Sequence, residues 1–207
     1  MRLIVLCVAT CLCVGCSSGD SRSLQETTKA SYDKQTGKLK ELTYDANKDG
    51  RIDTWTDMDG ARPVRSRLDR NQDGKLDRWE YYNADGGLQK VGFSRKDDGK
   101  PDAWAFSGAD GRVERVEISS SGDDQKIDRW ERYDAAGLVA ADEDRNGDGR
   151  PDKWETYDGG ALKTASFDEN GDGVADRRLT YAAGALVLIE SDPDGAGKYR
   201  ARVEVKP

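Results

Sequence analysis

The sequence contains no histidine, and its four cysteines all lie within the first 16 residues, at Cys7, Cys11, Cys13 and Cys16. The missing histidines exclude a histidine general base, a serine–histidine catalytic pair and a histidine-ligated zinc site. Beyond residue 16 the chain carries no thiol, so it can form no disulfide there.

Large apolar side chains are also scarce. Only 35% of the residues are hydrophobic, 35% are charged and 23 are glycine, so an ordinary thick core is not expected. The formal net charge is −7, and the acidic residues gather in short clusters along the chain. This charge disfavours nucleic acid as a partner and favours cations.

The N-terminal apolar stretch is short. Residues 1–15 place Arg2 before an apolar run of about a dozen residues, which is typical of a secretory signal and too short to span a membrane. The segment CVGCSS resembles a bacterial lipobox, although Cys13 stands where that motif prefers leucine. The resemblance implies acylation of Cys16, a membrane anchor and, from Ser17, sorting to the outer membrane. The alternative is a plain secretory signal. Residues 16–28 are predicted to form a polar tether.

A repeat organises the remaining sequence. Its five tryptophans, at positions 55, 79, 104, 130 and 154, are separated by 24, 25, 26 and 24 residues. The recurring unit is approximately D-x-N-x-D-G-x-x-D-x-W-x-x-Y-D-x-x-G-x-L. A fixed period of this length is typical of repeat proteins, whose terminal copies are often degenerate. We therefore predict one domain over residues 29–207, made of about seven units of 24–26 residues.

Each unit has the pattern of a β-hairpin. Aromatic-rich segments such as residues 78–82 and 153–157 suit strands, and turns rich in aspartate and glycine follow them at residues 83–87 and 158–160. A second strand, such as residues 162–167, completes the unit. The predicted fold is all-β: an elongated tandem β-hairpin repeat with Asp-rich calcium loops between the hairpins. The period does not distinguish a meander sheet from a solenoid.

The loops between the hairpins carry the oxygen pattern of a calcium loop. Such a loop supplies side chains at positions 1, 3, 5 and 9, the backbone carbonyl at position 7 and a glutamate at position 12, with glycine at position 6. Two copies match throughout: Asp69, Asn71, Asp73, Lys75, Asp77 and Glu80, and Asp144, Asn146, Asp148, Arg150, Asp152 and Glu155. Two more lack only the glutamate: Asp45, Asn47, Asp49, Arg51 and Asp53, and Asp168, Asn170, Asp172, Val174 and Asp176.

The remaining acidic segments are weaker candidates. The third copy has Ser94 and Lys96 at positions 1 and 3, and the fourth lacks the glycine, so both are predicted to bind no metal. The spacing of Glu190, Asp192 and Asp194 matches positions 1, 3 and 5 and suggests an incomplete site.

These loops are not expected to belong to EF-hands. Only thirteen residues separate Glu80 from Ser94, which is too few for two helices, and Pro101 and Pro151 have no N–H to pair loops at position 8. Over nine to twelve residues per unit, the pattern resembles the thrombospondin type 3 repeat and bacterial dockerin loops. The resemblance implies calcium-dependent rigidity outside the cytoplasm and no enzymatic activity.

Together these features predict a calcium-binding, lipid-anchored protein of the cell envelope that acts as a rigid scaffold or binding module and is not an enzyme. Its partners would be the membrane and an envelope protein or glycan. Three alternatives stay open at this point: a carboxylate-based glycoside hydrolase, a carbohydrate-binding surface protein that uses the tryptophan row, and a calcium-responsive adhesin. The loops could also be solvated turns that bind no metal.

Overall fold

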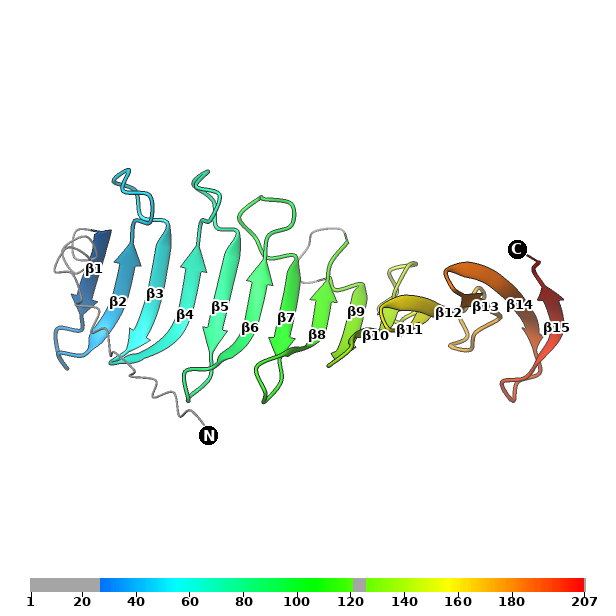
Figure 1. Cartoon of the computed structure of the whole chain (residues 1–207). Coiled ribbons are helices and arrows are strands. Elements are labelled where there is room, and N and C mark those ends of the chain that lie inside the picture. Colours follow the sequence, from blue (N-terminus) through cyan, green and yellow to red (C-terminus); the bar gives the residue numbers. More distant parts are fainter. Residues whose placement is uncertain (1–26, 121–125, 207) are drawn as a thin grey trace, which may run out of the picture.

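The computed structural model describes residues 27–120 and 126–206, and within them fifteen strands form one open antiparallel sheet in strict chain order (Figure 1). The strands are β1 (Thr28–Tyr32), β2 (Leu39–Tyr44), β3 (Thr54–Asp59), β4 (Arg62–Leu68), β5 (Arg78–Tyr82), β6 (Leu88–Phe93), β7 (Ala103–Ser107), β8 (Val113–Ile118), β9 (Arg129–Asp134), β10 (Gly137–Glu143), β11 (Lys153–Asp158), β12 (Ala161–Phe167), β13 (Arg177–Ala182), β14 (Ala185–Pro193) and β15 (Tyr199–Glu204). The all-β prediction is confirmed, and the arrangement is a meander sheet.

Some predictions lie outside the described residues. These are the signal segment over residues 1–15, Cys16 and most of the tether over residues 16–28. Within the described part of the chain, no helix has the length and apolar character needed to cross a membrane.

The two edges of the sheet carry different connections (Figure 1). Hairpin turns join each odd-numbered strand to the next one along one edge, and the acidic loops join even-numbered strands to odd-numbered strands along the other. Every hairpin from β1–β2 to β13–β14 also contains a register shift close to its turn. Such bulges increase the local twist of a sheet. The sheet twists along its length, so strands β10 to β12 are seen nearly edge-on in Figure 1.

The tryptophans lie in one row on one face of the sheet, called the tryptophan face here. Cross-strand pairing places one residue of the intervening strand between each two successive tryptophans: an arginine, a glycine, a glutamate and an aspartate. The row is Trp55, Arg67, Trp79, Gly92, Trp104, Glu117, Trp130, Asp142 and Trp154. A Cβ atom at Gly92 would lie 2.7 Å from Cζ3 of Trp104, so this indole packs directly over the glycine backbone. Lys90 Nζ lies 4.5 Å from the same ring's centroid. The indoles and their cationic neighbours therefore cover this side of the single layer.

The opposite face, called the glutamate face, carries smaller side chains at its centre. Ala141 is 1% exposed and Ala165 is 3% exposed although only one layer of strands is present. Longer side chains on neighbouring strands shield them, including the glutamates described below. The buried hydrophobic residues of the described chain are Trp79, Val91, Ala103, Ala141 and Ala165, which agrees with the thin core expected from the composition.

Candidate metal site along the loop edge

The acidic loops are stacked in order along one edge of the sheet. From the second loop onward, the N–H at position 1 donates to the carbonyl at position 9 of the preceding loop, as from Asp69 to Asp53 at 2.8 Å and from Asp168 to Asp152 at 2.9 Å. The N–H at position 9 bonds in turn to the last residue before its own loop, as from Asp77 to Leu68 at 2.9 Å. The edge is therefore one continuous hydrogen-bonded ladder, and neighbouring loops are held at a fixed spacing.

Each matching loop is folded around its own aspartates. In the fifth loop, Asp144 accepts N–H groups from Gly147 at 2.6 Å and Gly149 at 2.8 Å. Asp152 accepts the N–H groups of Arg145 at 3.1 Å and Asn146 at 3.0 Å through Oδ2. Equivalent bonds to position 1 and position 9 carboxylates recur in the first, second and sixth loops, at Asp45, Asp53, Asp69, Asp77, Asp168 and Asp176. The four loops thus share one conformation.

Two positions in each loop adopt left-handed backbone conformations. Position 6 is glycine, as predicted, and Gly74 and Gly149 have φ of 92° and 90°. Position 4 is left-handed as well, at Lys48 with φ of 64° and Gln72 with φ of 62°, which the sequence analysis missed. A non-glycine residue there costs roughly 1–2 kcal/mol, which the bonds to the position 1 carboxylate offset. The signal was present in the sequence, because the fifth loop has Gly147 at this position.

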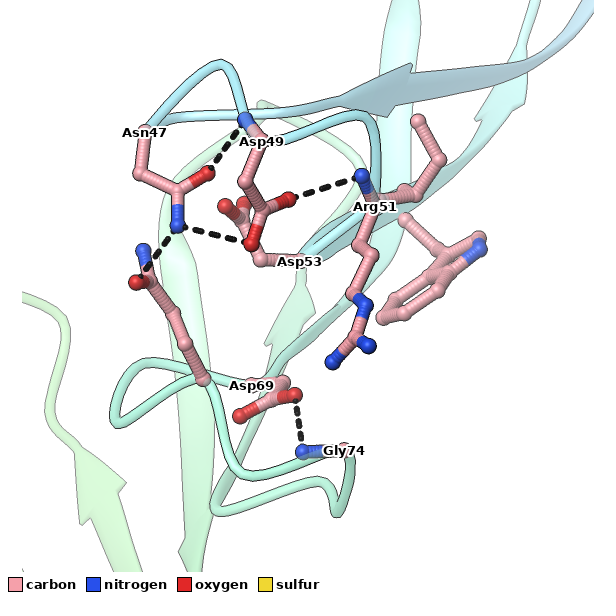
Figure 2. A pocket seen from close by; sticks show the side chains of 9 residues that line it. Asn47, Asp49, Arg51, Asp53, Asp69 and Gly74 are labelled. Atoms are coloured by element: carbon pink, nitrogen blue, oxygen red, sulfur yellow. Dashed lines mark hydrogen bonds between the residues drawn. The ribbon is translucent and has the colours of Figure 1, made fainter.

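The first two loops enclose a cavity of about 160 Å³ between them (Figure 2). Asn47, Asp49 and Asp53 of the first loop line it together with Asp69 of the second. Asn47 Nδ2 donates to Gln72 Oε1 at 2.7 Å across the junction and to Asp49 Oδ2 at 3.1 Å, as Figure 2 shows. Asp53 and Asp69 are each 7% exposed. Buried carboxylates from two successive loops therefore share one small cavity.

The donor chemistry of the loops suits a hard cation. Calcium takes carboxylate, amide and carbonyl oxygens, and an ionised carboxylate offers about four lone-pair sites, of which the backbone bonds use one or two. Among the described residues, no three aspartate, glutamate, histidine or cysteine side chains lie grouped as a metal site. An ion bound at this edge must therefore also use the amide oxygens at position 3 and backbone carbonyls, such as those of Arg51, Lys75, Arg150 and Val174 at position 7.

The structure does not bring the position 12 glutamates into the loops. Glu80 lies on β5 on the glutamate face, where its oxygens bond to Arg78 Nε at 2.6 Å and the Tyr82 hydroxyl at 2.6 Å. Glu155 lies on β11 and accepts the Tyr157 hydroxyl at 2.9 Å. Position 12 is the third residue of the strand that follows each loop, so its side chain belongs to the sheet. The signal that could have shown this is the alternation Arg/Lys-x-Glu-x-Tyr in RWEYY, RWERY and KWETY.

These glutamates form charged networks along the glutamate face. Glu155 contacts Lys153 Nζ at 2.8 Å and Arg129 at 3.1 Å. Burial opposes its charge, but the hydrogen bonds from Lys153 and Tyr157 outweigh burial and lower the pKa of Glu155. On β9, two strands away, burial and the bond to Glu131 raise the pKa of Tyr133 to about 12. The Glu155 carboxylate therefore remains ionised and the Tyr133 phenol remains neutral near neutral pH, which suits a structural role.

The weaker acidic segments differ from the four matching loops. In the third loop, Ser94 takes the place of the first aspartate and its Oγ accepts the N–H of Asp98 at 3.2 Å. In the fourth acidic segment, Ser119 and Asp128 make the ladder bonds of positions 1 and 9, so one more residue lies between them than in the other loops; Asp124 lies outside the described residues. Near the C-terminus, Glu190 lies on β14 and pairs with Arg178 at 2.6 Å, away from the turn that contains Asp194.

Comparisons with known proteins assign no family to the chain. No family model matches it, and no curated protein matches it. Among solved structures, the crystal structure of TarM is 13% identical with a TM-score of 0.38, and the match covers 47% of this chain and 18% of TarM. A mutant S. aureus TarM in complex with Fondaparinux, alpha-GlcNAc-glycerol and UDP is 14% identical with a TM-score of 0.37, over 51% of this chain and 22% of that one. Scores this low do not relate the chain to that protein.

Proposed function

We propose that this chain is a non-catalytic scaffold of the bacterial cell envelope whose loop edge binds calcium, and that an acyl anchor on Cys16 holds it to the outer membrane. The observation that carries the calcium proposal is the repeated loop. Four copies fold their oxygen-bearing side chains into the same hydrogen-bonded turn and stack on the same edge.

The charge of the loops supports this proposal. In the fifth loop, Asp144, Asp148 and Asp152 place three negative charges within nine residues, with Arg145 and Arg150 as the basic residues among them. Backbone N–H groups compensate these carboxylates only partly, because they carry no net charge. Calcium bound there would supply the missing positive charge and fix the oxygen side chains in place. The bound loop would resist bending between hairpins more strongly than the free loop.

The extended shape supports a scaffold role. Fifteen strands side by side, at about 4.8 Å per strand, give a sheet of roughly 70 Å from β1 to β15. A polar tether of residues 16–28 would separate this body from an acylated Cys16. The chain would then hold a partner at a set distance from the membrane surface, and the stiffness of the loop edge would set that distance.

Terbium luminescence tests calcium binding at a defined junction. Terbium takes the oxygen ligands of calcium, and Trp55 lines the cavity between the first and second loops. Excitation of tryptophan is expected to produce terbium emission that excess calcium displaces. Replacement of Trp55 by phenylalanine should remove a measurable part of that emission. The matched control is Trp104→Phe, beside the third loop that lacks the ligand pattern. An equal loss in both variants, or no emission at all, would reject binding at this junction.

A further inference from the structure

Cavities recur at the junctions between successive loops. The one between the first and second loops contains Asp53 and Asp69, and the one between the fifth and sixth loops contains Asp152 and Asp168. In both cases the pair is position 9 of one loop and position 1 of the next. The ladder bonds from Asp69 to Asp53 and from Asp168 to Asp152 hold the two members of each pair together. The same pair of positions therefore lines both cavities, although the rest of the lining differs between them.

The junction of the fifth and sixth loops contains an unsatisfied carboxylate oxygen. Asp152 is 7% exposed, and its Oδ2 accepts the N–H groups of Arg145 and Asn146. Its Oδ1 is buried and has no hydrogen-bond partner. Buried polar atoms without a partner are rare in folded proteins, and leaving one in place costs about 1–3 kcal/mol or more when the group is charged. This atom therefore indicates a missing positively charged or hydrogen-bonding partner.

The surroundings of Asp152 favour a hydrated cation as that partner. The cavity has a volume of about 510 Å³ and is also lined by Asn146, Asp168 and Asn170, whose side chains offer further oxygens. Glu169, Arg145 and Arg177 complete its charged lining, and the Arg145 guanidinium lies over the Phe167 ring at 5.8 Å from its centroid. Arg177 also lines the cavity, but its charge is compensated because it pairs with Glu169 at 2.6 Å and stacks on the Phe167 ring. Its buried Nε lacks a partner and could donate to water in the same space.

We propose that a divalent cation is shared between the fifth and sixth loops, with Asp152 and Asp168 as carboxylate ligands and the amide oxygens of Asn146 and Asn170 beside them. This inference rests on the proposed calcium function and adds that the ion belongs to a junction instead of to a single loop. An ion held in this way ties two successive hairpins together. The equivalent pair at the first junction is Asp53 and Asp69. At the junction of the second and third loops the pair is Asp77 and Ser94, so one of the two carboxylate ligands is missing.

Calorimetric calcium titration of isosteric variants tests the sharing. We compare the wild type with Asp152→Asn, Asp168→Asn and the double variant, after circular dichroism has shown that each retains the β-sheet spectrum. Asparagine keeps an oxygen that can accept the backbone N–H groups but removes the charge. The matched control is Asp158→Asn, which makes the same charge change at the exposed last residue of β11, beside the hairpin turn on the opposite edge.

A shared ion predicts that each single variant loses one bound calcium per chain and that the double variant loses no more than one. The control should bind as many ions as the wild type. If the double variant loses two ions, the loops bind separately and the inference is overturned; it is also overturned if Asp152→Asn loses none. A wild type that binds no calcium would instead overturn the proposed function itself, so the two failures are distinguishable.

Discussion

Treatment with EDTA is expected to lower the melting temperature of this protein by roughly 5–10 °C for each loop that holds calcium at saturating concentration. A ligand present at a hundredfold excess over its dissociation constant stabilises the folded state by about 2.7 kcal/mol. Without the ion, the carboxylates of each loop repel one another, and the aspartate, asparagine and glycine content of the loop favours many backbone conformations. The thermal transition followed by circular dichroism, with and without chelator, measures the effect.

Two controls make this result specific. Excess calcium added after EDTA should restore the original melting temperature, whereas raised sodium chloride should restore little of it, because screening cannot replace ligation. The particle should also lengthen or become more flexible in small-angle scattering when the ion is removed. Identical melting and scattering curves with and without chelator would mean that the loops hold their shape without calcium.

Replacement of Glu155 by alanine is expected to destabilise the protein by about 3 kcal/mol, the largest effect predicted for a single side chain. Glu155 is 8% exposed and accepts bonds from Lys153, Arg129 and Tyr157. Its removal leaves two cations and a phenol without their shared acceptor on the glutamate face. Urea unfolding in the presence of calcium measures the change in the free energy of unfolding.

The matched control is Glu114→Ala, which removes an exposed carboxylate and should change stability by less than about 0.5 kcal/mol. The effect of pH gives a second check. The pKa of Glu155 is lower in the folded protein than in the unfolded chain, where it is about 4.3. Ionised Glu155 therefore stabilises the fold at pH values above the unfolded pKa, and this stabilisation is lost as the pH falls through the folded pKa. The difference in free energy of unfolding between the wild type and Glu155→Ala should therefore become smaller below about pH 4. A small difference that does not change with pH would show that the network contributes little to stability.

Much of the fold could be predicted from the sequence because each unit carries the same strand and turn residues. The predicted strands at residues 78–82 and 153–157 correspond to β5 and β11, where aromatic residues favour a strand and the flanking residues favour turns. The regular bulges near the turns were not predicted. The choice between a meander and a solenoid depends on how each loop bonds to its predecessor, as from Asp69 to Asp53, and no single unit carries that information.

The sequence predicted where the acidic loops lie between the strands, whereas the calcium ligation predicted for them stays a prediction. The hydrogen bonds that Asp144 and Asp152 accept from their own loop were not predicted. Glu80 and Glu155 were assigned to the loops because they occupy position 12 of a familiar calcium pattern. A strand begins at Arg78 and at Lys153, however, and strand alternation decides where the glutamate side chains lie. The unsatisfied oxygen of Asp152 arises between two loops, so spacing within one loop could not show it.

Equilibrium dialysis against radioactive calcium tests the central claim, that the loop edge binds calcium, most directly. The purified protein is compared with a variant in which the position 1 aspartates of the four matching loops, Asp45, Asp69, Asp144 and Asp168, are replaced by asparagine. We expect saturable binding by the wild type with a dissociation constant of about 10⁻⁴–10⁻³ M, and loss of most of it in the variant. The absence of saturable binding at millimolar calcium, or equal binding by both proteins, would contradict the account.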